Sequence, residues 1–156
     1  LSLINQIATK PMERPTRLFD FVRYQLAHHP LERAYGGRKD GNWAYLSTAE
    51  VIRQAEELSA GLLKLGVKPG DKIALAVYQN RPEWVVTDLA IQQIGAINVP
   101  VYPTISPSDY EYIFNDAAVK FCFVGSGDVY DKVNKDKANV ASLEQIFTFE
   151  EQPGTT

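Results

Sequence analysis

Residues 72–101 decide the fold class, and they read KIALAVYQNRPEWVVTDLAIQQIGAINVPV. The stretch opens and closes with apolar runs, each short enough to be a buried strand. Between them, Asn80, Pro82 and Glu83 predict a helix start, with an asparagine cap, a proline in the first turn and an acid near the positive end of the helix dipole. Apolar residues then recur at helical spacing until Gly95, where the helix is expected to end. A strand, a helix and a second strand in this order favour a parallel pair joined by a right-handed crossover.

The same alternation continues on both sides of this stretch. Continuous apolar strands between amphipathic helices are typical of a parallel sheet that is covered on both faces. The sequence therefore predicts the α/β class, as a layered domain with a mostly parallel sheet between helices, preceded by an N-terminal arm and a helix. The expected strands of the sheet cover residues 72–78, 96–101, 119–124 and 145–149.

The segment before the sheet has three expected features. A helix is predicted over 16–29, and residues 36–41 are expected to form the tip of a hairpin because they are rich in glycine. Ser47 and Glu50 then form a capping-box pattern, which predicts a helix that ends at Gly66.

The helix between the second and third strands of the sheet has two candidate starts. Ser106 can be the cap with Pro107 at the first helical position, or Ser108 can be the cap with Glu111 as its partner in a capping box. The pattern leaves both starts open.

Composition excludes several classes of function. Sixteen Lys and Arg residues against nineteen Asp and Glu residues give a net charge of −3, and without a basic cluster there is little support for nucleic acid binding. No apolar run approaches the roughly 20 residues that a membrane-spanning helix needs. Cys122 is the sole cysteine, so an internal disulfide is excluded and a reducing compartment is favoured. Its apolar neighbours predict a core residue rather than a reactive thiol.

Few residues are candidates for a functional site. His28 and His29 are adjacent at a helix end, which favours a dipole contact over a metal site. The segment 125–128, Gly-Ser-Gly-Asp, is interpreted as a turn, with a nucleotide contact as the alternative, because a complete phosphate-loop motif is absent. Tyr102 and Thr104 are candidates for a pocket or an interface but not for catalysis. No catalytic, cofactor-binding or metal-ligating residue is assigned.

Three blocks in a fixed order indicate a family. Gly66-Val-Lys-Pro-Gly-Asp71 precedes Asn80-Arg-Pro-Glu83, and a Gly-Ala…Val-Pro block starts at Gly95. Together they resemble the N-terminal part of the AMP-forming acyl-CoA synthetases, which belong to the adenylate-forming superfamily with luciferases and peptide-synthetase adenylation domains. The form Val-Pro-Val-Tyr-Pro-Thr, over 99–104, is most similar to the long-chain fatty acid branch.

The resemblance implies a reaction and also a gap. Family members use ATP and Mg²⁺ to convert a carboxylate to an acyl-adenylate, and coenzyme A then displaces AMP. Their adenine-binding segment and C-terminal lysine have no counterpart in this sequence. Their phosphate loop has none either, because the Gly-Thr-Thr run at 154–156 follows Pro153 and lacks the Lys-Gly continuation. The expectation is therefore a piece of a fatty acid–CoA ligase that is inactive alone and binds no cofactor itself.

The resemblance also sets the expected organisation and partners. Residues 1–15 are expected to form an arm, 16–150 the N-terminal α/β subdomain, and 151–156 a linker at a truncation point. The parent enzyme is expected to take a fatty acid, ATP and coenzyme A, and to pack against the remainder of its own chain. A homodimer through the arm is also expected, as is a cytoplasmic location, with a peripheral position at the inner membrane face as the alternative. Two other functions stay open: adenylation of an amino or aryl acid, and a non-catalytic α/β binding module.

Overall fold

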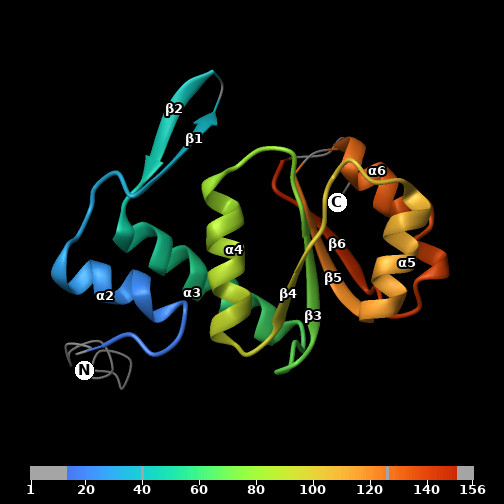
Figure 1. Cartoon of the computed structure of the whole chain (residues 1–156), viewed down its shortest axis with the longest axis horizontal. Helices are drawn as coiled ribbons and strands as arrows, with labels where there is room; N and C mark the ends of the chain where they lie inside the picture. The colour runs from blue at the N-terminus through green and yellow to red at the C-terminus, as the bar shows by residue number, and fades with distance from the viewer. Residues whose placement is uncertain (1–13, 40, 126, 151–156) are drawn as a thin grey trace.

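The computed structural model describes residues 14–39, 41–125 and 127–150 (Figure 1). The predicted arm falls almost wholly outside these residues, as does the predicted linker over 151–156. Four parallel strands form the sheet in the order β4-β3-β5-β6, which confirms the predicted α/β class. The strands are β3 (Lys72–Ala76), β4 (Ile97–Pro100), β5 (Val119–Val124) and β6 (Gln145–Thr148).

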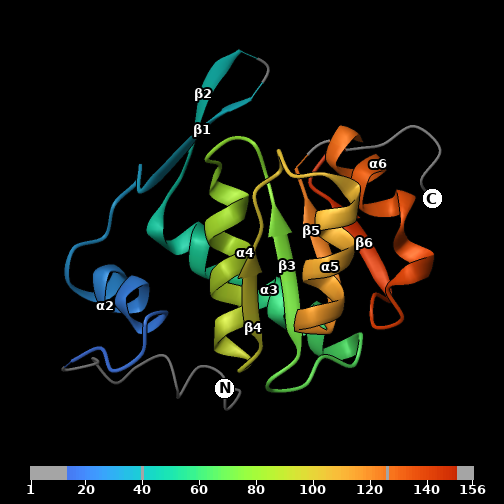
Figure 2. The same ribbon diagram turned by 45° about the vertical axis from the view of Figure 1, so that its right-hand side comes forward.

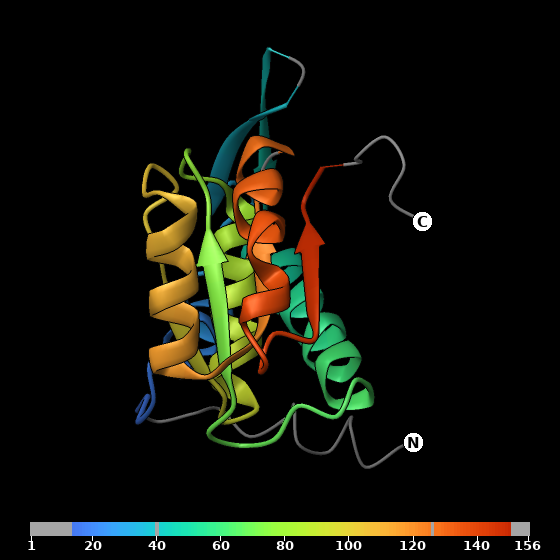
Figure 3. The same ribbon diagram turned by 90° about the vertical axis from the view of Figure 1, so that its right-hand side faces the viewer.

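Helices cover both faces of this sheet, as predicted. One face carries α3 (Thr48–Lys64) and α4 (Pro82–Gln93), and the other carries α5 (Pro107–Ala117) and α6 (Gly127–Lys135). Figure 3 looks towards the face that α5 and α6 cover, with these helices in front of the strands. A single turn of 3₁₀ helix (Lys137–Asn139) leads from α6 towards β6.

Along each strand, alternate residues face opposite layers of the core. Ile73, Leu75, Phe121 and Phe123 face α3 and α4, where they pack with residues such as Leu62 and Ile91. The residues between them are smaller, and they face α5 and α6, whose Tyr110 and Phe114 are large and fully buried: Ala74, Ala76, Cys122 and Val124. Side chains of alternating direction therefore give one sheet two cores of different make-up.

The strand ends agree with the roles that proline allows. β4 is an outer strand of the sheet, and Pro100 is its last residue. A residue without a backbone N–H is tolerated at such a position. Gly66, Gly70 and Gly95 all have positive φ, as expected for two helix ends and for the second central position of a type II turn over 68–71.

Before the sheet, α2 (Asp20–His28) and a hairpin of β1 (Tyr35–Lys39) and β2 (Asn42–Leu46) lie beside α3 and α4 (Figure 2). The hairpin was expected, but its tip was placed wrongly at 36–41, because Gly36 and Gly37 are strand residues. An added Cβ would lie 2.9 Å from the Tyr45 ring at Gly36 and 2.7 Å from Pro82 at Gly37. Glycine serves close packing there and not a turn.

The start of α2 is four residues later than the predicted start at Thr16. The Asp20 carboxylate accepts hydrogen bonds from the backbone N–H and the guanidinium of Arg17, with Nη2 to Oδ1 at 2.9 Å, and from the Thr16 hydroxyl at 3.3 Å. These bonds hold the preceding turn outside the helix. Leu18, which lies in this turn, is 74% exposed.

Two of the predicted helix starts are settled by side-chain bonds. Ser47 and Glu50 make the predicted capping box. Ser106, and not Ser108, caps α5, and its box partner is Asp109 instead of Glu111.

The predicted Asn80 cap of α4 is wrong. Arg81 is the N-cap residue, without a side-chain cap, because its guanidinium bonds forward to Glu83 instead. Helix α6 was not predicted at all. It is held by Val129 and Val133, which are spaced four apart and are both buried. None of the helices in the described residues is both long and apolar enough to cross a bilayer.

Candidate functional site at the carboxyl edge of the sheet

The topology singles out one position on the sheet. β3 and β5 are neighbours, yet the chain leaves β3 for α4 on one face and leaves β5 for α6 on the other face. In open α/β sheets such a divergence lies outside the carboxyl ends of the strands and is where ligands bind. The segments that follow β3, β4, β5 and β6 all meet at this edge.

Arg81 joins three of these segments. Its Nη1 donates to the carbonyl oxygen of Gly125 at 3.3 Å and to the Glu150 carboxylate at 3.0 Å, while Nε and Nη2 donate to Glu83, both at 3.1 Å. Its guanidinium also lies 5.3 Å from the centre of the Phe149 ring. Hydrogen bonding to Glu83 is the largest cause that raises the pKa of Arg81. With two carboxylates beside it, Arg81 positions the strand ends and has no excess charge to attract an anion.

A second set of contacts joins α6 to the segments after β3 and β4. The Tyr78 hydroxyl donates to the Asp128 carboxylate at 2.7 Å. The Lys132 ammonium donates to the Tyr78 oxygen at 2.9 Å and to the Pro103 carbonyl oxygen at 3.0 Å. Lysine, tyrosine and aspartate thus form a continuous chain of charge-assisted bonds across the edge.

Tyr102 is displayed on a backbone that is fixed on both sides. The hydroxyl of the buried Tyr110 donates to the Tyr102 carbonyl oxygen at 3.2 Å, and Lys132 holds the next carbonyl. Burial is the main cause that raises the pKa of Tyr110, so its hydroxyl keeps the proton that it donates. The Tyr102 side chain is 81% exposed, and Thr104 is exposed beside it. Both residues therefore lie at the carboxyl edge of the sheet with exposed side chains.

The other residues singled out from the sequence are not brought to this edge as reactive groups. Cys122 is fully buried, and burial raises the pKa of its thiol. His28 Nδ1 donates to the Tyr24 carbonyl oxygen at 2.9 Å, and its ring stacks on the Tyr24 ring with 4.0 Å between ring centres, both on α2. Of the segment 125–128, Gly125 follows β5 and bonds Arg81, while Gly127 and Asp128 begin α6 and Asp128 bonds Tyr78. The run at 154–156 lies outside the described residues.

The edge is a surface of hydrogen-bonded polar and aromatic side chains. Within residues 14–39, 41–125 and 127–150, no group of three His, Cys, Asp or Glu side chains could hold a metal ion. A shallow hollow of about 400 Å³ lies elsewhere, on the outer face of α5, between mostly polar side chains: Ser108, Glu111, Tyr112, Asn115 and Asp116.

Sequence reasoning missed the residues that organise this edge. Tyr78 ends the predicted strand 72–78 and Arg81 follows it by three residues, which was the available signal, but Arg81 was interpreted only as part of a helix start and of a family block. Lys132 gave no signal, because the helix that contains it was not predicted.

Comparison with known families identifies the class of protein. A family model described as AMP-binding enzyme matches residues 22–155, so the chain belongs to the AMP-binding enzyme family. The match confirms the resemblance found in the three sequence blocks.

Two relatives with similar sequences are named as ligases of long-chain fatty acids. Over 108 residues the chain is 29% identical to the long-chain-fatty-acid–CoA ligase FadD15 of Mycobacterium bovis, which covers 69% of this chain and 18% of the relative. Over 78 residues it is 38% identical to long-chain-fatty-acid–CoA ligase 6 of Rattus norvegicus, covering 49% of this chain and 11% of that protein. The chain thus spans less than a fifth of either relative.

Solved structures agree on the fold. A Rhodopseudomonas palustris protein with the provisional designation of long-chain-fatty-acid CoA ligase is 26% identical, with a TM-score of 0.74, over 88% of this chain and 33% of that one. The anthranilate CoA ligase AuaEII, in complex with anthranoyl-AMP, has a TM-score of 0.72 at 22% identity, over 90% of this chain and 27% of that one. At that identity the second likeness shows the fold alone.

Proposed function

We propose that this chain is the N-terminal α/β part of a long-chain fatty acid–CoA ligase. The matches to FadD15 and to ligase 6 are the observation that supports this proposal, since both are long-chain-fatty-acid–CoA ligases by name. In the proposed reaction, ATP activates the fatty acid as an acyl-adenylate, and coenzyme A takes the acyl group. A carboxylate is a poor electrophile, so the phosphate charge has to be neutralised for the first step.

The described residues do not fit the charged cofactors of this reaction. The edge offers no carboxylate cluster for Mg²⁺, and Arg81 is compensated by Glu83 and Glu150. We therefore assign this chain a supporting role: the contacts of Arg81 and Lys132 fix the ends of the strands, and Tyr102 is presented on that fixed base. No catalytic step is assigned to its residues.

The proposal includes inactivity of the 156-residue chain alone. With palmitate and ATP, the isolated chain is expected to show no pyrophosphate exchange above a buffer blank. Measurable exchange would sink this part of the proposal, provided that it tracks the chain through a second purification step.

Substrate class is tested on the product of the whole reading frame that encodes this chain. We expect pyrophosphate exchange that depends on palmitate and not on anthranilate or on amino acids. Exchange that depends on anthranilate would favour the aryl-acid alternative, to which AuaEII gives a fold likeness only. Absence of exchange with every acid would contradict the ligase proposal.

The alternative of a free-standing binding module predicts covered sheet edges. Within the described residues, β4 and β6 are the outer strands and neither has a further strand beside it. Phe147, on β6, and Phe149 are only partly buried against Phe123. These features support a part that packs against more protein, because open edges and partly exposed aromatic residues favour association.

Location and self-association complete the proposal. A cytoplasmic location is supported by the single buried cysteine, and cell fractionation tests it.

A homodimer through residues 1–30 is tested by light scattering at two concentrations. A measured mass that stays at the mass of one chain at both concentrations contradicts it.

A further inference from the structure

A polar contact between three helices lies at the C-terminal end of α4. The last four carbonyl groups of a helix lack partners within it. In α4, the backbone N–H groups of residues 95 and 96 bond the carbonyl oxygens of Gln92 and Ile91. The Ala90 carbonyl oxygen has a donor from another helix, because the hydroxyl of Ser59 on α3 bonds it at 3.0 Å. Both of these residues are buried, so a side chain of α3 caps α4 inside the protein.

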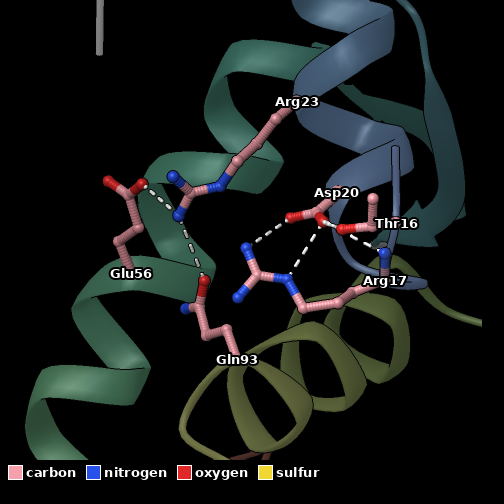
Figure 4. A network of polar contacts seen from close by, with 6 residues as sticks. All are labelled: Thr16, Arg17, Asp20, Arg23, Glu56 and Gln93. Atoms are coloured by element: carbon pink, nitrogen blue, oxygen red, sulfur yellow. Dashed lines mark hydrogen bonds and ion pairs between the residues drawn. The ribbon is translucent and has the colours of Figure 1, made fainter. Parts of the chain in front are cut away.

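Gln93, the last residue of α4, holds this hydroxyl in place. Its amide nitrogen donates to the Ser59 oxygen and, at 2.8 Å, to the carbonyl oxygen of Ala55 on α3. Its amide oxygen accepts from the guanidinium of Arg23 on α2 at 3.3 Å. The same guanidinium nitrogen bonds the Glu56 carboxylate at 2.9 Å. Figure 4 shows Arg23 between these two partners.

The partners of Gln93 allow its amide group one orientation. A backbone carbonyl only accepts a hydrogen bond and a guanidinium only donates, so the amide nitrogen has to face Ala55 and the amide oxygen has to face Arg23. The Ser59 hydroxyl accepts from this nitrogen and donates to Ala90, which fixes the direction of its hydrogen as well. Arg23 therefore orients, through one amide group, a hydroxyl to which it is not itself bonded.

Helix α2 also covers the seam between α3 and α4, which is defined by Ala55, Ser59 and Ala90. Val22 of α2 packs in one cluster with Ala55 and Ala90. Only two of the nine residues of α2 are buried. Docking of α2 therefore depends on few contacts, and the bonds of Arg23 are among them.

We propose that docking of α2 and capping of α4 are coupled, with Arg23 as the positioning residue and Gln93 as the link. When α2 is docked, the Gln93 amide is oriented and the Ser59 hydroxyl stays on the Ala90 carbonyl. When α2 leaves the seam, the amide oxygen loses its donor, and water competes for the bond that caps α4. The first residue of β4, Ile97, is four positions after Gln93, so this conformational device connects the N-terminal helix to an outer strand of the sheet.

Amide hydrogen exchange on the 156-residue chain tests the coupling. Coupling free energies are reciprocal, so loss of the cap should loosen α2. Ser59→Ala is expected to speed exchange of the amides of residues 24–28 by about threefold or more, the size expected for residues that share one network. Ser106→Ala removes a capping hydroxyl from α5, on the other face of the sheet, and should leave these amides unchanged. No change with Ser59→Ala, or an equal change with both variants, would overturn the proposal.

A variant of Arg23 tests the coupling in the other direction. Arg23→Met keeps the apolar stem and removes the guanidinium, and it is expected to shift the NMR resonance of the Ala90 carbonyl carbon. Arg53→Met breaks an exposed ion pair with Glu57 on α3 and is expected to leave that resonance in place. An unmoved resonance in Arg23→Met would contradict the coupling, because α4 would then be capped without regard to α2.

The role of Gln93 as the link has its own test. In a Gln93→Met background, Ser59→Ala is expected to have no further effect on exchange in α2, and a persisting effect would exclude Gln93 as the link. If the Gln93→Met protein does not fold, the Ala90 resonance still decides. None of these measurements uses ATP, fatty acid or coenzyme A, so their outcome is independent of the ligase assays.

Discussion

The guanidinium of Arg81 and the carbonyl oxygen of Gly125 are joined by a 3.3 Å hydrogen bond across the point where the chain leaves β3 and β5 for opposite faces of the sheet. The two residues are 44 positions apart. Since Arg81 also bonds Glu150 beyond β6, one side chain fixes the relative positions of three segments that follow strands.

Replacement of Arg81 is therefore expected to loosen the carboxyl edge of the sheet. Arg81→Ala should lower the free energy of unfolding by about 2 kcal/mol, because it removes several charge-assisted bonds and leaves Glu83 without its partner. Arg81→Lys should restore only part of the loss, since a compact ammonium group lacks the planar fork that bonds both oxygens of Glu83 while Nη1 bonds Gly125 and Glu150. Urea unfolding measures both. A loss below about 0.5 kcal/mol for Arg81→Ala would show that these bonds contribute little.

The contact of Asp20 with Arg17 predicts a dependence of stability on pH (Figure 4). Hydrogen bonds from the Arg17 side chain are the largest cause that lowers the pKa of Asp20 to about 2. A carboxyl group with a lowered pKa stabilises the fold above its unfolded pKa of about 4, and that stability is lost as pH falls from about 4 to about 2. Because Arg17 is largely exposed, the contribution is reduced by solvent to about 1 kcal/mol.

Asp20→Asn should remove this part of the acid sensitivity. Urea unfolding at several values of pH is expected to show a shallower decline between pH 4 and pH 2 than in the unaltered protein. Asp131→Asn, on the exposed side of α6, is the matched control and should leave the decline unchanged. Parallel curves for the unaltered protein and Asp20→Asn would contradict the assignment.

The two candidate caps of α5 can be told apart by paired alanine variants. Ser106→Ala removes the acceptor for the Asp109 N–H and the donor to its carboxylate, and should cost about 1 kcal/mol. Ser108→Ala, two residues on, is expected to change stability by less than half as much. Thermal unfolding compares them, and a larger effect at Ser108 would favour the cap that the structure rejects.

Gly37 has close neighbours and Gly61 has open space around it, so alanine variants at these two positions form a matched pair. Gly37→Ala should destabilise the protein by about 1–3 kcal/mol, because the new methyl group meets Pro82. Gly61→Ala, within α3 and with open space around its Cβ position, should stabilise it by about 0.5–1 kcal/mol. Urea unfolding measures both, and a neutral Gly37→Ala would mean that the hairpin can move away from α4 at little cost.

The sequence predicts the layered part of the fold well because its signals are local. Apolar runs, the Ser47–Glu50 box and glycine at helix ends are each set by a few neighbouring residues. The hairpin tip was misplaced because Gly36 and Gly37 serve contacts with Tyr45 and Pro82, and the second of these is 45 positions away. Local pattern cannot distinguish a glycine needed for close packing from a glycine needed for a turn.

The candidate site was less predictable than the fold, for the same reason. Tyr102 and Thr104 were singled out and do lie at the carboxyl edge. Arg81 and Lys132 act there through partners on other segments, such as Gly125 and Pro103, and such pairings depend on the order of the strands in the sheet. No single stretch of sequence is sufficient to predict that order.

The unequal filling of the two layers bears on how this domain can change over evolutionary time. Under α5 and α6 the volume is held by the helices, through Tyr110 and Phe114, and the strands supply Ala74 and Ala76. Growth at either alanine therefore has to be matched by shrinkage on α5, and we expect positions 74 and 76 to covary with 110 and 114 among related sequences. In the layer of α3 and α4 the strands already carry phenylalanine. Substitutions that change side-chain volume there are therefore expected first in α3 and α4.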